Sequence, residues 1–297
     1  MVAEIRDGDH LGRGEAVAYA RYGEHTASVL AELEMARGAI EAGCSRAELQ
    51  SVLSAGAARN ALDCALWDLA AKQAGVRVWT LAGRARLDPV KTCFTLSLDT
   101  PQAMAEAARA QAGRPMLKLK IGGADGLEQV AAVRAAAPRT RLVVDANEAL
   151  TFDDLIRLAP ELAQLRVLLI EQPLPAALDE ALEGYASPVP LCADESLHTR
   201  AELAACARRY AGINIKLDKS GGLPEALALA ADARALGLEI MAGCMVATSL
   251  AIAPALLLAQ GAAFVDLDGP LLLACDREPG LAITGSTIFP PPPELWG

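Results

Sequence analysis

Three carboxylates occur along the chain at nearly equal intervals, each at the end of an apolar run. Asp145 follows LVV, Glu171 follows VLLI and Asp194 follows PVPLCA. The gaps of 26 and 23 residues each fit one strand-loop-helix-loop unit, so we expect the three acids on neighbouring strand ends. One acid in such a place would more often cap the following helix. Three in consecutive units favour a metal site, and hard oxygen ligands select Mg²⁺ or Mn²⁺ over zinc.

Lysines flank the acids on both sides. In the run MLKLKIGG, strand alternation places Lys118 and Lys120 on one face about 6.6 Å apart. Crowding of like charge and partial burial lower the pKa of a lysine, which is what a general base needs near neutral pH. Lys216 is expected on the sixth strand, roughly across the barrel from Lys120. Lys219, in the loop after that strand, is its rival.

Two further acids, Asp266 and Asp268, fall on the expected eighth strand and alternate, so both should point inward. They form either a loop-capping pair or an anionic pocket for an ammonium group. The three candidate lysines and five acids together carry a net charge of −2. One divalent cation would balance that charge in a cavity that tolerates little unpaired charge.

Short apolar runs alternate with Ala-rich helical stretches from residue 90 onward. We expect eight strands, at 91–97, 116–121, 141–145, 167–171, 190–194, 212–217, 238–243 and 263–267. Seven helices are expected between them, at 101–112, 125–137, 152–164, 178–186, 199–209, 223–236 and 248–260. This alternation implies parallel strands with right-handed crossovers. The chain after the eighth strand has turn residues and β-type alternation, so the expected α/β fold is a (β/α)7β modified TIM barrel.

Residues 1–87 have a different pattern, with helices expected near 26–41 and 55–74. We therefore predict a small α+β capping domain at 1–87, a catalytic barrel at 88–275, and a segment at 276–297 that packs back on the capping domain. The net charge of −10 argues against nucleic acid and anionic membranes as partners. Seven cysteines without a CxxC pair, and no signal peptide at the start, indicate reduced thiols and a cytoplasmic location. The apolar stretch 249–265 contains Pro254 and Gln260, so we expect no membrane span.

These residues, in this order, resemble the enolase superfamily, in its muconate-lactonizing (mandelate racemase/muconate lactonizing enzyme) subgroup. The match runs from ALDCALWDLAAKQAG through KLK, DAN, EQP, ADES and INIKLDKSGG. It looks closest to the dipeptide epimerases of the L-Ala-D/L-Glu type, which carry an Asp-x-Asp on the eighth strand, here VDLDGP.

The resemblance implies roles for the candidate residues. Asp145, Glu171 and Asp194 would hold one Mg²⁺ per subunit, with Mn²⁺ as an alternative, and the metal would bind the substrate carboxylate. Lys120 and Lys216 would be the two acid/base catalysts, on opposite faces of the α-carbon, in a 1,1-proton transfer through an enediolate. Lys118 would contact the carboxylate, and Asp266 and Asp268 would bind the α-ammonium of a dipeptide.

The resemblance departs from the family pattern at the amino terminus, where members begin with a further strand and a specificity loop that closes over substrate. The capping domain is therefore expected to be truncated. The expected activity is epimerisation of L-Ala-D/L-Glu from murein peptide recycling. Alternatives are N-acylamino acid racemisation, o-succinylbenzoate synthesis, muconate cycloisomerisation, or a remnant that binds metal without turnover. The second residue of the dipeptide, the preferred metal and homo-oligomer formation stay open.

Overall fold

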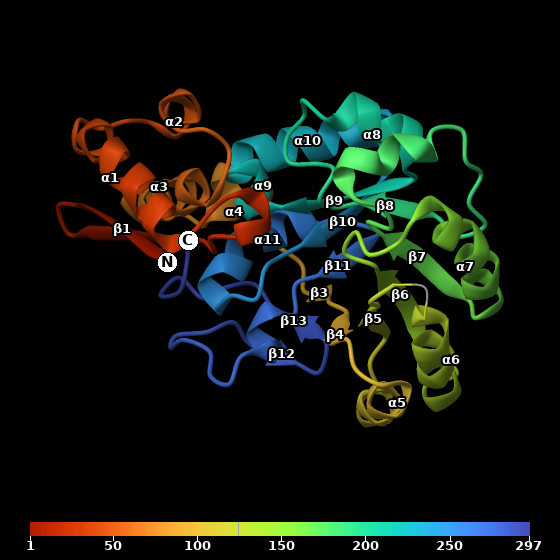
Figure 1. Ribbon diagram of the computed structural model, residues 1–297. Coiled ribbons are helices and arrows are strands. Elements are labelled where there is room, and N and C mark those ends of the chain that lie inside the picture. The colour runs from red at the N-terminus through yellow and green to blue at the C-terminus, as the bar shows by residue number, and fades with distance from the viewer. Residues whose placement is uncertain (124) are drawn as a thin grey trace. The chain divides into compact units, whose positions relative to one another are not determined.

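The computed structural model of the protein describes residues 1–123 and 125–297. The chain divides into two compact units. The first unit comprises Met1–Val90, Ile215–Ala231 and Ala242–Gly297, and the second comprises Lys91–Asn214 and Asp232–Met241. Figure 1 shows the helices and strands of both units, coloured along the chain.

Eight parallel strands form the sheet of a nearly closed barrel, in the order β11-β10-β9-β8-β7-β6-β5-β4. The strand order follows the chain order, as the strand-helix alternation predicts. The strands are β4 (Phe94–Leu96), β5 (Met116–Lys120), β6 (Arg141–Asp145), β7 (Val167–Glu171), β8 (Leu191–Ala193), β9 (Gly212–Lys216), β10 (Glu239–Gly243) and β11 (Phe264–Asp266). Each overlaps one of the eight predicted strands, which confirms the predicted fold class. Leu142, Val143 and Val144 of β6 are at most 1% exposed, as expected where a parallel sheet is covered on both faces.

Helices connect these strands. They are α5 (Pro101–Ala110), α6 (Gly126–Ala136), α7 (Phe152–Gln164), α8 (Leu203–Arg209), α10 (Leu223–Ala235) and α11 (Ser249–Ala259). Figure 1 shows α6 and α7 beside β6 and β7. Local sequence fixes where several of them begin. Thr151 and Asp154 form a capping box at the start of α7, and Thr100 caps α5 with Pro101 in its first turn.

One predicted helix was wrong in type. The stretch predicted as a helix at 178–186 is η2 (Ala176–Leu182), a 3₁₀ helix that follows Pro175. Its two buried residues, Asp179 and Leu182, are three positions apart, which matches the three residues per turn of a 3₁₀ helix. A glycine with a left-handed backbone, Gly184 at φ +82°, follows two residues after its end.

The amino-terminal part of the first unit is an antiparallel hairpin packed on helices. It consists of β1 (Val2–Asp7), β2 (His10–Glu15), η1 (Ala20–Tyr22), α1 (Thr26–Glu41), α2 (Arg46–Val52), α3 (Ala57–Ala74) and α4 (Val78–Leu81). The predicted helices at 26–41 and 55–74 are confirmed. Glycines let β2 lie directly on α3, because a Cβ at Gly12 or Gly14 would come within 2.1 Å of the carbonyl oxygen of Ala65 or Ala61. The hairpin and α2 were not located from the sequence.

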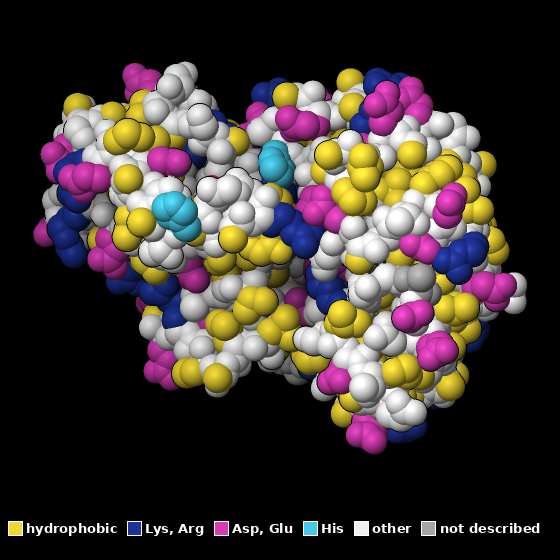
Figure 2. Space-filling view, viewed as in Figure 1, with side chains coloured by type: hydrophobic (Ala, Val, Ile, Leu, Met, Phe, Trp, Pro, Cys, Tyr) yellow, Lys and Arg dark blue, Asp and Glu magenta, His cyan; other side chains and the backbone are white. Residues whose placement is uncertain are grey.

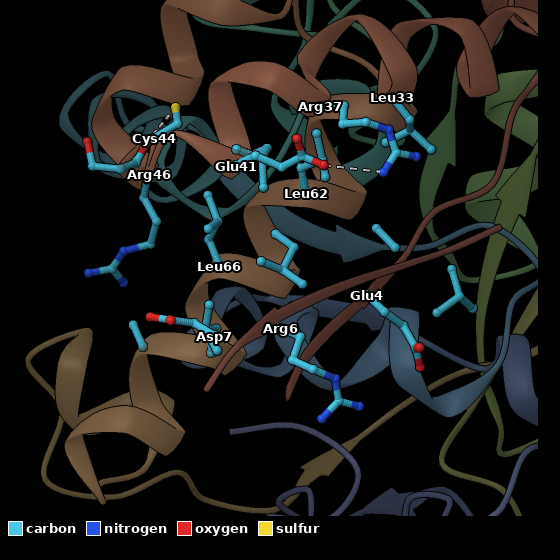
Figure 3. Close-up of a pocket in the computed structure, with 18 of the residues that line it drawn as sticks. Glu4, Arg6, Asp7, Leu33, Arg37, Glu41, Cys44, Arg46, Leu62 and Leu66 are labelled. Atoms are coloured by element: carbon cyan, nitrogen blue, oxygen red, sulfur yellow. Dashed lines mark hydrogen bonds and ion pairs between the residues drawn. The ribbon is translucent and has the colours of Figure 1, made fainter. Parts of the chain in front are cut away.

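A groove of about 850 Å³ lies between β1, α1 and α3. Figure 3 shows Leu62 and Leu66 of α3 facing it, with Arg37 and Glu41 of α1 along one side and Glu4 and Arg6 of β1 along the other. All of its lining residues fall within positions 2–73, so it contains none of the predicted site residues. We therefore assign this groove no part in the chemistry.

Three side chains near the start of α3 bind the segment that follows β9. The Arg59 guanidinium donates to the carbonyl oxygens of Ser220 and Gly221, at 2.7 and 2.9 Å. Asn60 donates to the Asp218 carboxylate at 3.0 Å, and Asp63 accepts the backbone N–H of Leu223 at 2.8 Å.

The bound segment contains α9 (Leu217–Ser220) and two glycines with left-handed backbones, Gly221 and Gly222. A Cβ at Gly222 would lie 2.5 Å from an Asp63 carboxylate oxygen, so this close approach requires glycine. α3 therefore fixes the backbone directly after Lys216.

The carboxyl-terminal part of the first unit contains η3 (Gly269–Leu272) and the antiparallel pair β12 (Ile283–Thr284) and β13 (Thr287–Ile288), with β3 (Val90–Lys91) beside β13. The turn-rich pattern after the eighth strand is thus confirmed as β structure. Trp296 is 1% exposed and its indole N–H donates to the carbonyl oxygen of Cys64 at 3.0 Å. The backbone N–H of Gly297 donates to Asp68, so the last residues contact α3.

Acidic and basic side chains are interspersed on the face shown in Figure 2. All seven cysteines are free thiols. Across residues 1–123 and 125–297, the structure has no helix long and apolar enough to cross a bilayer.

The α3 contacts predict how stability depends on pH. Burial raises the pKa of Asp63 to about 7, against the lowering effects of the Leu223 N–H, Arg46 and Arg59. The folded protein therefore holds this proton more tightly than the unfolded chain. Its contribution to the free energy of unfolding is present in acid and is lost as pH rises through about 7, by up to about 1.4 kcal/mol per pH unit. Asp63→Asn should flatten this slope between about pH 4 and 7, the interval between the unfolded and folded pKa of Asp63, in urea denaturation.

Asp218, whose pKa burial raises to about 6, contributes in the same direction, so a smaller slope should persist in the variant. The matched control is Asp153→Asn at an exposed position of α7, which should keep the wild-type slope. An unchanged slope in Asp63→Asn would contradict the account.

Candidate active site at the carboxyl ends of the strands

The second unit brings the three predicted acids to the ends of three consecutive strands. Asp145 is the last residue of β6, Glu171 is the last residue of β7, and Asp194 comes directly after β8. Asp145 and Glu171 lie opposite each other in the β6–β7 register. Their exposed fractions are 0%, 0% and 1%, so three carboxylates are buried together at one edge of the sheet.

Lys118 and Lys120 of β5 supply the countercharge. The Lys118 ammonium lies 3.0 Å from an Asp145 oxygen and 2.8 Å from a Glu171 oxygen. The Lys120 ammonium donates to the same Asp145 oxygen at 2.6 Å. Lys118 is buried, whereas the Lys120 side chain is 32% exposed and so can reach a bound molecule.

The ionisation of Asp145 follows from this arrangement. Burial alone would raise its pKa, but the attraction of Lys118 and Lys120 outweighs burial and holds the pKa of Asp145 below its ordinary value. Asp194 acts in the opposite direction, since its negative charge lies close enough to raise the pKa of Asp145. Asp145 is therefore a carboxylate at neutral pH.

Uncharged amides that sequence reasoning missed complete the acid cluster. The Asn147 side-chain oxygen accepts from the Lys120 ammonium at 2.7 Å, and its amide donates to Glu195 at 3.2 Å. The Asn214 amide, two residues before Lys216, donates to a Glu171 oxygen at 2.8 Å. The Gln172 side-chain oxygen accepts the backbone N–H of Asp194 at 2.8 Å. The available signal was their place in the motifs DAN, INIK and EQP, directly beside the predicted residues.

The remaining predicted residues lie in the first unit. Lys216 is the last residue of β9 and is 7% exposed, and Asp266 is the last residue of β11. Cys244 lies close to all three charged residues. Burial raises the pKa of its thiol well above the ordinary value, the negative charges of Asp266 and Asp268 raise this pKa further, and the positive charge of Lys216 lowers it. The structure thus places both acids within electrostatic reach of one thiol.

Two positions differ from the sequence-based expectation. Asp268 lies beyond the end of β11, at the residue that precedes η3, because the chain turns into Gly269-Pro270 there. Both acids are still buried, at 6% for Asp266 and 3% for Asp268. Lys219 was expected in a loop but lies in α9, at 3% exposed.

The acid cluster fits a hard divalent cation. Three buried carboxylates on adjacent strand ends offer oxygen atoms only, which is the donor chemistry of Mg²⁺ and Mn²⁺. Lys120, hydrogen-bonded to one of these acids and partly exposed, is placed for proton transfer next to such an ion. The arrangement suits removal of a proton next to the carboxylate of a bound molecule, because a cation held by the three acids would stabilise the negative charge that develops on that carboxylate.

Comparison with known proteins shows similarity over both parts of the chain. Residues 4–83 match the mandelate racemase/muconate lactonizing enzyme N-terminal domain, and residues 102–269 match the enolase C-terminal domain-like family. The chain is 48% identical to an L-Ala-D/L-Glu epimerase of Escherichia coli K12, covering 96% of this chain and 89% of that protein. It is 44% identical to an N-acetyl-D-glutamate racemase of a Pseudoalteromonas species, covering 100% and 95%.

A solved structure gives the same result. An enolase family member from Agrobacterium tumefaciens with homology to dipeptide epimerases, solved with bound sodium and L-Ala-L-Glu, superimposes with a TM-score of 0.98. The two sequences are 51% identical, over 100% of this chain and 91% of that one. The fold, the acid cluster and these matches lead to one conclusion: the chain belongs to the enolase superfamily, in its mandelate racemase/muconate lactonizing enzyme group.

Proposed function

We propose that the protein is an isomerase, a Mg²⁺-dependent dipeptide epimerase that inverts the α-carbon of the carboxyl-terminal residue, with L-Ala-D/L-Glu as substrate. The observation that carries this proposal is the buried cluster of Asp145, Glu171 and Asp194 with Lys120 hydrogen-bonded to it. The similarity to an L-Ala-D/L-Glu epimerase over 96% of the chain supports the choice of substrate. The role in murein peptide recycling is part of the same proposal.

In this mechanism Asp145, Glu171 and Asp194 hold one Mg²⁺ per subunit, or Mn²⁺ in its place. The bound ion supplies electrostatic stabilisation for the substrate carboxylate. Lys118, which bridges Asp145 and Glu171, adds positive charge beside that carboxylate.

Lys120 and Lys216 transfer the protons. One neutral lysine takes the α-proton as the C–H bond breaks, and the other, as an ammonium, returns a proton to the opposite face. The reaction consumes no proton overall and inverts the centre. Asp266 and Asp268 bind the ammonium of the dipeptide, which is the feature that separates a dipeptide from an N-acylated amino acid.

A racemase of N-acylated amino acids is the second candidate, because the N-acetyl-D-glutamate racemase is 44% identical over the whole chain. Its substrates lack the charged amine that would pair with Asp266 and Asp268. The substrates of o-succinylbenzoate synthases and muconate cycloisomerases also have no charged amine. A remnant without turnover would bind the metal and catalyse no reaction.

We further infer a capping domain at 1–87, a barrel at 88–275 and a segment at 276–297 that packs on the capping domain. The family matches at 4–83 and 102–269 and the Trp296–Cys64 hydrogen bond support this division. A cytoplasmic location is part of the proposal, with a small-molecule substrate and no nucleic acid or membrane as partner.

The direct test is incubation of L-Ala-L-Glu and N-acetyl-L-glutamate with the protein and Mg²⁺, followed by chiral chromatography. The proposal expects L-Ala-D-Glu to accumulate much faster than N-acetyl-D-glutamate. Preferential turnover of the N-acetyl compound would assign the second function, and no turnover of either would favour the remnant.

Removal of the metal should abolish activity reversibly. EDTA should stop epimerisation and excess Mg²⁺ should restore it, because three buried carboxylates converge on one ion. Asp145→Asn, Glu171→Gln and Asp194→Asn should each weaken Mg²⁺ binding at least tenfold in calorimetry. Full activity in excess EDTA would refute the metal site.

Each proposed catalytic lysine should be essential for inversion. Lys120→Ala and Lys216→Ala should each lower epimerisation at least a thousandfold, since one base reaches one face only. In D₂O one variant should still exchange the α-proton of a single enantiomer, measured by NMR. Lys219→Ala is the control and should keep its activity. If Lys219→Ala is inactive while Lys216→Ala epimerises normally, Lys219 and not Lys216 is the second acid/base residue.

Asp266→Asn or Asp268→Asn should raise KM for free-amine dipeptides by roughly tenfold to a hundredfold, because a charge-assisted hydrogen bond contributes about 1.5–3 kcal/mol. Turnover of N-acetylated analogues should change little, because a neutral amide has no charge to pair with these carboxylates. Steady-state kinetics on matched L-Ala-L-Glu and N-acetyl-L-Ala-L-Glu measure the difference. Equal effects on both substrates would count against the dipeptide assignment.

A further inference from the structure

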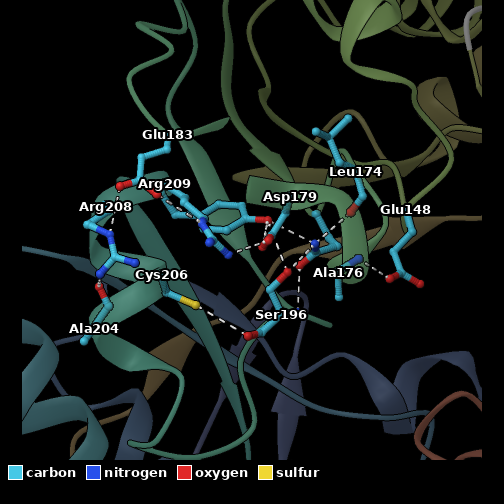
Figure 4. Close-up of polar contacts among 12 residues, drawn as sticks. Glu148, Leu174, Ala176, Asp179, Glu183, Ser196, Ala204, Cys206, Arg208 and Arg209 are labelled. Carbon is cyan, nitrogen blue, oxygen red and sulfur yellow. Dashed lines mark hydrogen bonds and ion pairs between the residues drawn. The ribbon is translucent and has the colours of Figure 1, made fainter. Parts of the chain in front are cut away.

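A chain of buried polar contacts in the second unit leads away from the acid cluster. It runs from Gln172, directly after β7, through Ser196 and Tyr210 to Asp179 in η2. Figure 4 shows Asp179 between Arg209 and the loop that carries Ser196. Asp179 is 2% exposed and Tyr210 is 5% exposed, whereas Ser196 is half-buried, so all but one member of this network lie inside the protein.

The Gln172 side chain binds the backbone on both sides of Glu195. Its amide oxygen accepts from the N–H of Asp194 at 2.8 Å and from the N–H of Ser196 at 3.1 Å. The backbone of Gln172 is left-handed, with φ +34°, a conformation that residues other than glycine seldom adopt. Gln172 therefore holds the main chain from which the Asp194 carboxylate projects.

The contacts of the Gln172 NH₂ group fix the orientation of the side-chain amide. Its NH₂ group lies 2.9 Å from the carbonyl oxygen of Leu174, 2.7 Å from the Ser196 hydroxyl and 3.1 Å from the Tyr210 hydroxyl. A flipped amide would set its NH₂ group against two N–H donors and its oxygen against a carbonyl, so one orientation only satisfies the site.

Asp179 completes the chain by fixing Tyr210. The Tyr210 hydroxyl donates to Asp179 at 2.9 Å, and Arg209 binds the other Asp179 oxygen at 2.8 Å. Burial, together with the negative charge of Asp179, raises the pKa of Tyr210, so its hydroxyl stays protonated. Since its proton points to Asp179, a lone pair of the hydroxyl oxygen is left to accept from Gln172.

We propose that Gln172 is a positioning residue for Asp194, and that Tyr210 and Asp179 lock it in the orientation that gives the cation site its affinity. This inference rests on the proposed metal function, and it assigns a role to residues that contact neither substrate nor metal. Outer partners of metal ligands typically change affinity 10-fold to 100-fold.

The test is Mn²⁺ binding by electron paramagnetic resonance, at a temperature well below the unfolding transition of every variant. Gln172→Leu should weaken binding about tenfold to a hundredfold, and Tyr210→Phe, one contact further out, about threefold to tenfold. Tyr185→Phe is the matched control, because Tyr185 packs against Phe152 outside this network, and it should bind as the wild type does.

Kinetics separate positioning from a general loss of structure. In Tyr210→Phe the Mg²⁺ concentration for half-maximal activity should rise in the same ratio as the dissociation constant, while kcat at saturating Mg²⁺ stays within about twofold. A merely structural role would lower kcat at every Mg²⁺ concentration and leave the Mn²⁺ affinity of the folded protein unchanged.

The outcomes distinguish this inference from the proposed function. Wild-type protein that binds no Mn²⁺ would overturn both. Wild-type binding with unchanged affinity in Gln172→Leu and Tyr210→Phe would overturn the positioning role alone. If Gln172→Leu does not fold, Tyr210→Phe carries the test, because it removes a single oxygen atom.

Discussion

The ion pairs between β5 and the ends of β6 and β7 are the interaction on which the site depends. Asp145 and Glu171 are fully buried, and carboxylates in that position are strongly destabilising unless their charge is compensated. Lys118 compensates both at once and Lys120 compensates Asp145. The sheet register makes this possible, because Lys120 lies opposite Asp145 and Asp145 lies opposite Glu171. The same lysines hold the pKa of Asp145 below its ordinary value, so this residue stays a carboxylate, the form that can bind a cation.

Uncharged amide side chains position the backbone next to these charged residues. Asn147 comes two residues after Asp145 and Gln172 comes directly after Glu171, and both have left-handed backbones. Their side chains bind the segment after β8, at Glu195 and at the backbone N–H of Asp194. In the first unit, α3 performs the same task for the segment after Lys216, where Arg59 and Asn60 bind Ser220 and Asp218. The charged residues at the strand ends are therefore positioned by contacts of the segments that follow the strands, as well as by the strands themselves.

Periodicity in the sequence predicted the strands well, because strands covered on both faces are continuous apolar runs bounded by turn residues. The acids and lysines could be found for the same reason, since a charge at the end of such a run stands out. Other features depend on tertiary contacts. The 3₁₀ geometry of η2 matches the burial of Asp179 and Leu182 three positions apart. The contacts of Asn147, Gln172 and Asn214 depend on which segments meet at the strand ends. Asp268 was predicted on the eighth strand, but that strand ends at Asp266 and Asp268 precedes η3.

The central claim is that ammonium groups and a divalent cation share one set of buried carboxylates. Calorimetric titration of Mg²⁺ into wild-type protein and Lys118→Met tests it most directly, because methionine fills a similar volume without the charge. If Lys118 and the cation compete for Asp145 and Glu171, the variant should bind one Mg²⁺ per subunit several-fold more tightly than the wild type. Equal or weaker binding in a folded Lys118→Met variant would contradict the claim.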